Sequence, residues 1–281
     1  MPKKVQVTLT GNESKLLIAR AALRLPEVQH ALAHSKVLLI GGTTVSALAE
    51  ALGYAPMRIS GRIVASGTRT APTTLQSAHS LLIQDGKAVN ADKQIRQIVE
   101  EMTEKDLIIV GANAMDPHGR AALAFASVDG GSRGYALHDA HLRGVPMRIL
   151  CGLNKLVPDL GPAVEHSGWS DIEASMGAAI GMYPVSGSIV TEIEAYEILC
   201  GVQAVVIAGD GIASGAGSRT FVLIGEEETV RQAWELTCVL KGARLSGDRD
   251  SLAQCYGGCD ACGRHVGCMY KAAAAEEAAA R

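Results

Sequence analysis

Apolar residues in the first 176 positions form short runs that alternate with amphipathic segments. Residues 37–40, 107–110 and 147–151 are almost wholly apolar, as is typical of strands buried on both faces of a parallel sheet. Helical spacing is found at residues 14–25, 27–34, 45–52 and 90–102, and further strands are predicted at 59–65 and 80–84, around a polar loop at 66–74. This alternation predicts an α/β domain over residues 1–176, with an N-terminal helical segment and a doubly wound, mostly parallel sheet.

The pattern changes near residue 177. A predicted helix at 192–199 is followed by strands at 202–208 and 220–224 and by a second helix at 227–241. This order predicts a small α+β domain over residues 177–245, compatible with a ferredoxin-like arrangement. Residues 246–281 lack a periodic core pattern and form a cysteine-rich tail that ends in an alanine-rich segment.

Four cysteines in that tail carry the strongest chemical signal of the chain. Cys255, Cys259, Cys262 and Cys268 are spaced C-x3-C-x2-C-x5-C with glycines between them. Short glycine-containing gaps allow several thiolates to surround one metal centre. Because all four fall within 14 residues, an iron–sulfur cluster is favoured over zinc, whose sites usually pair two distant C-x2-C knuckles. A redox disulfide and unligated thiols remain alternatives.

Composition narrows the range of partners. The chain has 281 residues, a formal net charge of −3 and only 4% aromatic residues, without a basic stripe. These features argue against a nucleic-acid partner. No secretory signal and no long apolar run is found, so the sequence predicts no membrane partner and a cytoplasmic protein, in which thiols stay reduced.

Glycine and hydroxyl residues follow the predicted buried strands. Gly41, Gly42, Thr43 and Thr44 lie between a strand and a helix, where backbone N–H groups and the helix dipole favour an anion. The loop at 111–119, the segment 151–155 and the glycine-rich segment 130–134 follow in the same pattern, and ligands bind at such strand ends in open parallel sheets. The alternative for Gly41–Thr44 is a tight turn with Thr44 as the helix N-cap. The predicted ligand-binding residues are Gly41, Gly42, Thr43, Thr44, Arg69, Gly111, Ala112, Asn113, Asp116, Gly130 and Gly131.

Two of these segments resemble a known superfamily. LLIGGTTVSALA at 38–49 resembles the sugar-phosphate sensor domains of DeoR-type repressors, and IVGANAMDPHG at 109–119 resembles a second hallmark of the same group. That superfamily includes ribose-5-phosphate isomerase, glucosamine-6-phosphate deaminase and the CoA transferases, and methylthioribose-1-phosphate isomerase has a similar G-A-D segment. The resemblance covers roughly residues 35 to 158. It implies an isomerase/CoA-transferase-like fold and a phosphorylated ligand.

One departure bears on catalysis. The isomerase branch has a catalytic aspartate where this chain has Asn113, and an amide cannot act as a general base near neutral pH. We therefore expect no isomerase activity of the methylthioribose type. Other catalytic candidates are Asp116, His118 and Lys155, and the alternatives are a solvated loop histidine for His118 and a plain surface lysine for Lys155. If the chain is an enzyme, an isomerase or transferase is implied.

The sequence thus leads to two hypotheses. In the first, the chain binds a small phosphorylated or anionic metabolite, such as a sugar phosphate, a nucleotide or a CoA-like molecule, and carries a four-cysteine metal site. In the second, it is a non-catalytic subunit of a larger complex that senses redox or iron state. A homo-oligomer is compatible with both.

Overall fold

A six-stranded mixed sheet forms the centre of the molecule. The computed structural model describes residues 1–71, 75–127, 130–253, 265 and 268–270. The strand order is β12 (Ser188–Val190), β10 (Met147–Leu150), β7 (Leu107–Gly111), β2 (Val37–Ile40), β5 (Ser80–Gln84) and β6 (Lys87–Asn90). The first four strands are parallel to one another, whereas β5 and β6 are antiparallel. The predicted α/β class is confirmed, with a mixed sheet.

The three apolar runs of the sequence are the buried strands β2, β7 and β10. Every residue of β2 and β7 is buried, and in β10 only Arg148 is partly exposed. Arg148 is held by an ion pair of 2.6 Å to Glu27. Because the parallel strands β2, β7 and β10 run in the same direction, their carboxyl ends lie along one edge of the sheet.

Helices surround this sheet. They are α1 (Gly11–Ala22), α2 (Pro26–His34), α3 (Thr43–Ala51), α4 (Ile95–Glu100), α5 (Gly131–Leu142) and α6 (Leu160–Glu165). Helix α1 packs on α3, and α4 packs on α5. The helix predicted at 90–102 is shorter than expected, because Asn90 ends β6 and α4 starts only at Ile95.

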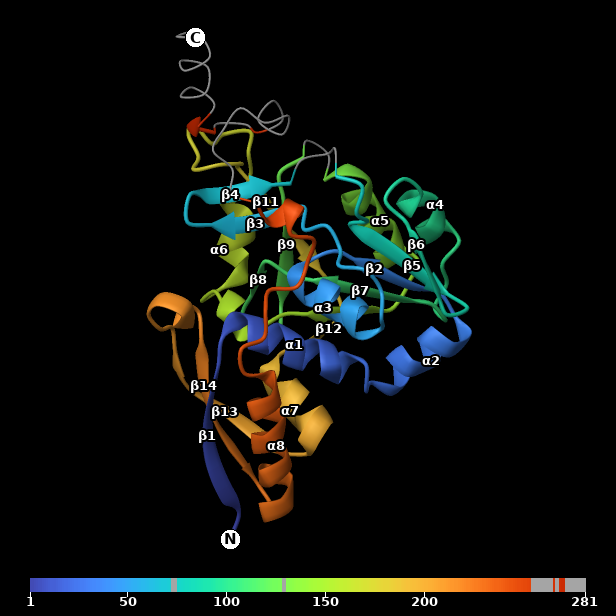
Figure 1. Ribbon diagram of the computed structural model, residues 1–281. Helices are drawn as coiled ribbons and strands as arrows, with labels where there is room; N and C mark the ends of the chain where they lie inside the picture. The colour runs from blue at the N-terminus through green and yellow to red at the C-terminus, as the bar shows by residue number, and fades with distance from the viewer. Residues whose placement is uncertain (72–74, 128–129, 254–264, 266–267, 271–281) are drawn as a thin grey trace.

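A second, antiparallel sheet contains both early and late parts of the chain. Its order is β1 (Lys3–Leu9), β14 (Arg219–Gly225) and β13 (Gln203–Gly209), and α7 (Glu192–Cys200) and α8 (Glu227–Leu240) pack against it. Figure 1 shows this unit below the main sheet, with the N-terminus at its tip. Its core residues belong to the same buried cluster as those of β2 and β7, so the two sheets share one hydrophobic core.

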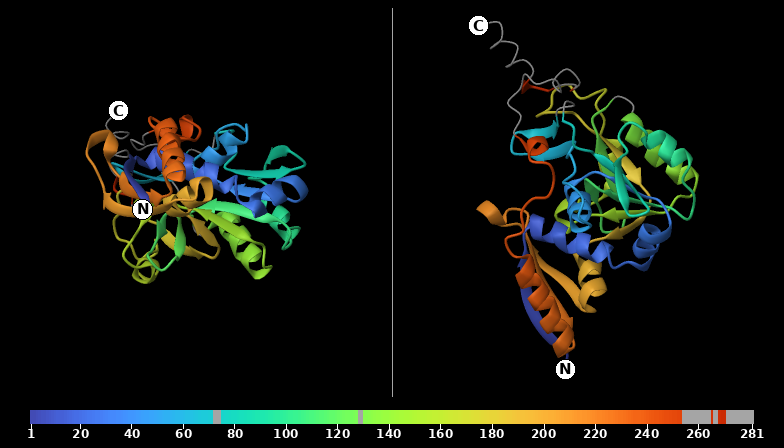
Figure 2. Two further views of the ribbon diagram at one scale, coloured as in Figure 1. Left: turned by 90° about the horizontal axis from the view of Figure 1, so that it is seen from below. Right: turned by 45° about the vertical axis from the view of Figure 1, so that its right-hand side comes forward.

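Two smaller sheets complete the fold. One has the order β11 (Gly181–Val185), β9 (Ala121–Phe125) and β8 (Ala114–Met115), and the other is the hairpin of β3 (Gly61–Val64) and β4 (Gly67–Thr70). In the right-hand view of Figure 2, β3 and β4 lie away from the second sheet. The predicted loops at 66–74 and 111–119 are therefore partly wrong. β4 pairs through backbone hydrogen bonds despite its polar sequence, and β8 pairs with β9.

The helices of the molecule are short compared with the thickness of a membrane. Among the residues described above, no helix is both long and apolar enough to cross a bilayer.

Candidate functional site

The turn after β2 is an uncapped helix start. Helix α3 begins at Thr43, and its N-cap residue Gly42 has no side chain to accept hydrogen bonds from the first-turn amides. Thr44 is buried, and its hydroxyl has no hydrogen-bond partner among the described residues. The N-cap alternative for Thr44 is wrong, because Thr44 is already the second residue of the helix. The positive end of α3 therefore lacks a side-chain acceptor at the edge of the sheet.

His79 lies directly beside this turn. A Cβ atom on Gly41 would approach the His79 carbonyl oxygen to 2.3 Å and the ring Nδ1 to 2.7 Å. The ring Nδ1 is 2.8 Å from the Arg58 carbonyl oxygen, which can only accept, so Nδ1 carries the proton and Nε2 has the lone pair. Burial and the charge of Arg133 hold the pKa of His79 well below its ordinary value. His79 is thus a neutral hydrogen-bond acceptor through Nε2.

Asp92 fixes this arrangement from the segment after β6. Its carboxylate accepts hydrogen bonds from the backbone N–H groups of His79 (3.0 Å) and Ser80 (2.8 Å) and forms an ion pair of 2.6 Å with Arg58. The side chains of Asp92 and Arg58 therefore hold the start of β5 against Gly41.

Arg133 adds a positive charge that acts on His79. It lies in the first turn of α5, after Gly130 and Gly131, which both have positive φ angles of 69° and 63°. Its positive charge lowers the pKa of His79. Burial lowers the pKa of Arg133 itself, and within the described ranges no hydrogen bond or ion pair of its side chain is found. A half-buried guanidinium in this state is well suited to an anionic ligand.

The end of β7 is more fully occupied by protein contacts. The Asn113 side-chain oxygen accepts a hydrogen bond of 3.0 Å from the Ala124 N–H, and the Asn113 backbone N–H donates to the Ala122 carbonyl over 2.8 Å. The carbonyl of Ala112 accepts a hydrogen bond of 2.5 Å from Lys155 Nζ. These contacts join the residues after β7 to β9 and to the segment after β10.

Asp116 has a structural environment. Its buried carboxylate accepts hydrogen bonds from Arg120 Nε (2.7 Å) and from the backbone N–H groups of His118 (3.0 Å) and Leu160 (3.1 Å). Although burial opposes it, these donors hold the pKa of Asp116 well below its usual range. His118 itself is exposed on the loop. Asp116 is therefore an anion that organises this loop, with its oxygens already engaged.

Lys155 and Glu192, which follow β10 and β12, both influence the pKa of the Cys151 thiol. Glu192 is fully buried, and one carboxylate oxygen accepts a hydrogen bond of 2.8 Å from the Leu153 N–H. Burial raises the pKa of Glu192, although hydrogen bonds from the Leu153 N–H and the Ser14 side chain oppose that shift. Burial likewise raises the pKa of the neighbouring Cys151 thiol. Glu192 therefore begins helix α7 from an unusually buried position.

Lys15 is expected to titrate near pH 8. Burial and the charge of Lys155 lower its pKa from 10.5 to about 8. An unfolded chain has this lysine at its ordinary pKa, so between about pH 8 and 10.5 the unfolded state binds more protons. The free energy of unfolding should therefore rise with pH across that window. Chemical denaturation at a series of pH values measures this slope. Lys15→Met should reduce it, whereas Lys3→Met, at an exposed position, should not, and equal slopes in both variants would contradict the assignment.

Arg69 is placed differently from the sequence expectation. It is only 2% exposed, and its guanidinium donates to the carbonyls of Thr68 (3.1 Å) and Ser66 (2.8 Å). It also lies 4.4 Å from the ring centre of Tyr270. Arg69 therefore holds the β3–β4 hairpin to the described end of the tail, and none of the contacts found for it is with the β2 turn.

Only part of the cysteine motif lies within the described residues. Cys255, Cys259 and Cys262 lie outside the described residues. Cys268 is buried, and its backbone forms an isolated β-bridge with Ser175. His265 is also buried, and its Nε2 lies 2.7 Å from the Thr70 hydroxyl. Among the described residues, no group of three or more histidine, cysteine, aspartate or glutamate side chains is arranged to hold a metal. One end of the cysteine run is thus anchored on the folded body, beside the β3–β4 hairpin.

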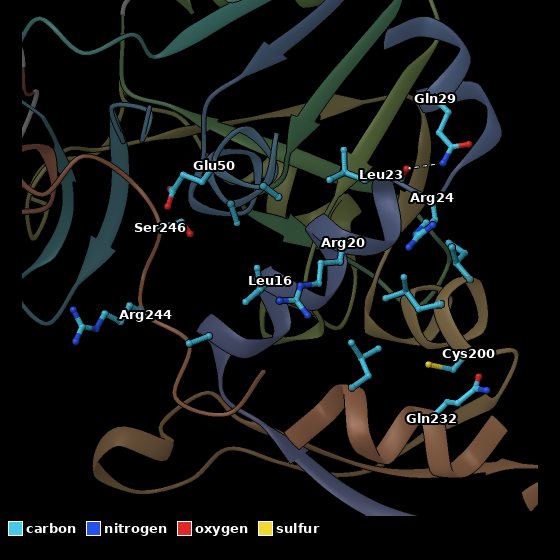
Figure 3. A pocket seen from close by; sticks show the side chains of 16 residues that line it. Leu16, Arg20, Leu23, Arg24, Gln29, Glu50, Cys200, Gln232, Arg244 and Ser246 are labelled. Carbon is cyan, nitrogen blue, oxygen red and sulfur yellow. Dashed lines mark hydrogen bonds between the residues drawn. The ribbon is translucent and has the colours of Figure 1, made fainter. Parts of the chain in front are cut away.

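A large open cavity lies between the two sheets, away from the β2 turn. Its volume is about 1270 Å³, and α1, α3, α7 and α8 contribute to its walls. Figure 3 shows Arg20 and Arg24 pointing into it, with Glu50 across from them. The Glu50 carboxylate already accepts hydrogen bonds from Ser46 (2.9 Å) and the Gly247 N–H (3.2 Å). This cavity is a second place at which arginine side chains could attract an anion.

Neither a protein-family model nor a curated protein matches this chain. The function is therefore argued from the geometry of the β2 turn and its neighbours.

Proposed function

We propose that this chain binds a small phosphorylated or otherwise anionic metabolite at the carboxyl end of β2. The observation that carries the proposal is the uncapped start of α3 against His79, where the Thr44 hydroxyl is buried and has no hydrogen-bond partner among the described residues. Burial disfavours the charged form of Arg133, and an anionic ligand would offset that cost.

The surrounding groups favour the same ligand. The first-turn amides of α3 lack a side-chain cap, and the helix dipole is positive at this end. Neutral His79 can accept a hydrogen bond through Nε2, which suits a hydroxyl of the ligand better than a second anionic oxygen. A phosphate ester of a polyhydroxy compound combines both kinds of group.

The resemblance to the isomerase/CoA-transferase superfamily supports a sugar phosphate, nucleotide or CoA-like ligand and a doubly wound fold. It does not extend to turnover, because the Asn113 amide oxygen is used to hold β9. We therefore propose binding rather than isomerisation. The alternative of a redox- or iron-sensing subunit remains a proposal for the tail.

Arg133→Met is expected to weaken phosphate binding at least 10-fold. A hydrogen bond to a charged group contributes about 1.5–3 kcal/mol, and about 1.4 kcal/mol corresponds to a factor of 10 in affinity. Isothermal titration calorimetry with inorganic phosphate and with ribose 5-phosphate measures the change. Binding to the unchanged protein should also weaken as salt concentration increases.

Two further variants locate the bound anion. Arg143→Met, in the exposed C-cap of the same helix α5, should leave the affinity unchanged. Arg20→Met, in the cavity between the sheets, should also leave it unchanged. Loss of affinity in Arg20→Met with full affinity in Arg133→Met would place the anion in that other cavity and contradict the proposal.

We further propose that Cys255, Cys259, Cys262 and Cys268 hold one metal centre, with an iron–sulfur cluster favoured over zinc. The spacing and the glycines support it, and thiolates are the preferred ligands of both. The anchoring of Cys268 at Ser175 would keep such a centre next to the β3–β4 hairpin.

Cys259→Ser combined with Cys262→Ser is expected to remove essentially all bound iron. This pair spares Cys268 and His265, which contact the folded body, so the melting transition of the sheets should persist. Anaerobic purification with iron, zinc and sulfide analysis measures the result, and Cys238→Ser, an exposed position on α8, is the control. If the unsubstituted protein contains one zinc and no iron, the four cysteines form a zinc site and not an iron–sulfur cluster. Metal-free protein with alkylatable thiols would end the metal hypothesis.

A further inference from the structure

A second, smaller cavity is walled by aromatic rings. Its volume is about 580 Å³, within the range of small-molecule sites, and it lies between α5, β9, β11 and the segment 164–169. Phe125 and Tyr183 form one wall as an edge-to-face pair with ring centres 6.0 Å apart. Tyr135 and Trp169 also line it.

This concentration of rings is unusual for a chain with so few of them. The whole sequence has ten aromatic residues, two Phe, two Trp and six Tyr, and four of them line this one cavity. Unlike Tyr196 and Phe221, which are fully buried in the core, the four rings are half-buried or exposed. Apolar ring surface left facing an open cavity is stabilised when a ligand covers it.

Glycines on α5 open the floor of the cavity. Gly130 and Gly134 are one helical turn apart and so lie on the same side of the chain as it enters α5. A Cβ atom on Gly130 would lie 3.3 Å from the Gly134 Cα and 3.9 Å from the Phe125 ring. The absence of side chains at both positions leaves room in this part of the cavity, next to the Phe125 ring.

Polar groups stand at the edge of this space. Arg96 lies over the ring of Tyr135, with 4.5 Å between its guanidinium carbon and the ring centre. His138 follows Gly134 by one turn and is exposed, and Ser127 is also exposed at the edge. These side chains offer hydrogen bonds to ring nitrogens and hydroxyl groups.

We propose that this cavity binds the planar base of a nucleoside. The base would stack on the aromatic wall over the glycine floor, with its ring nitrogens and sugar hydroxyls toward Arg96, His138 and Ser127. Stacking on aromatic side chains and a few hydrogen bonds at the edge is a general mode of base recognition. The inference does not depend on anion binding at the β2 turn, because a nucleoside carries no phosphate.

Tryptophan fluorescence offers a direct test with adenosine as the probe. Trp169 and Trp234 are the two tryptophans of the chain, and Trp234 lies on α8, outside this cavity. In a Trp234→Phe protein, adenosine should change the emission of Trp169 in a saturable way. Gly134→Val should weaken this binding at least 10-fold by filling the floor. Gly134 lies inside a helix, where glycine is unfavourable, so this variant should remain folded.

Controls decide between the possible outcomes. His141→Val, an exposed position near the end of α5, should bind adenosine normally. No saturable change with millimolar adenosine in fluorescence or calorimetry would overturn the proposal. Equal binding by Gly134→Val, or equal competition by non-aromatic cyclohexanol, would overturn it as well. Arg133→Met should retain adenosine binding, so failure of the anion site and failure of this site are separable.

Discussion

Gly41→Ala is expected to abolish anion binding and to destabilise the protein, whereas Gly42→Ala next to it should do neither. A methyl group on Gly41 would lie 2.3 Å from the His79 carbonyl oxygen, which is backbone and cannot rotate away. Overpacking of this kind costs typically about 1–3 kcal/mol and shifts the backbone. Here the shift would move His79 and the start of β5 away from the helix terminus of α3.

Gly42 provides a matched control in the neighbouring position. A Cβ atom there would meet nothing within 4 Å, and the φ angle of 166° is extended backbone that any residue adopts. Gly42→Ala should therefore change the free energy of unfolding by about 0.5 kcal/mol or less. Chemical denaturation and phosphate calorimetry on both variants measure the contrast. Equal behaviour of the two would mean that His79 does not pack on Gly41 as described.

The main sheet is predictable from sequence because its strands are buried on both faces. Such strands need continuous apolar sequence, and β2, β7 and β10 have it. β1 is absent from the sequence prediction, although Val5, Val7 and Leu9 alternate with polar residues, which is the period of a strand with one buried face. The alternation indicates a strand, but the strand that pairs with β1 is β14, which lies far along the chain.

β4 cannot be predicted from an apolar pattern. Its sequence is Gly67–Thr70 with no apolar residue, and it is held by β3 and by backbone hydrogen bonds to the segment 176–178. The Thr68 N–H donates to the Met176 carbonyl over 2.9 Å, and the Ala178 N–H donates to the Thr68 carbonyl over 2.9 Å. Tertiary pairing decides the structure where local preference is weak.

Only the Gly41 turn of the candidate site can be predicted from the sequence; His79 cannot. A strand followed by glycine and threonine at a helix start indicates the turn at Gly41. His79 reaches it from the residue before β5, so only the folded sheet brings it there, and Arg133 acts on His79 from α5. Arg133 lies within the predicted glycine-rich segment at 130–134, and its charge is a signal that could have marked it as a candidate. No local pattern distinguishes His79 from the other seven histidines of the chain.

Gly177→Ala is expected to be among the most destabilising single substitutions in this chain, at about 3 kcal/mol or more. Gly177 has a φ angle of +89°, and a Cβ atom there would lie 1.8 Å from the Thr68 carbonyl oxygen and 2.1 Å from Arg69 Nη1. The change therefore combines backbone strain with a clash against a strand and a buried guanidinium. The β3–β4 hairpin would have to separate from residues 176–178.

Gly86→Ala separates these two causes. Gly86 also has a positive φ angle, +70°, but a Cβ atom there meets nothing within 4 Å. It should lose only about 1–2 kcal/mol, the strain of a left-handed residue. Denaturation curves give both values, and similar losses in the two variants would contradict the close contact at Thr68.

Because Thr70 of the same hairpin bonds to His265, Gly177→Ala should also increase the reactivity of the buried Cys268 thiol toward alkylation in metal-free protein, while Gly86→Ala should not. The tail would then be stabilised by the hairpin, and the hairpin by the glycine that lets residues 176–178 approach it.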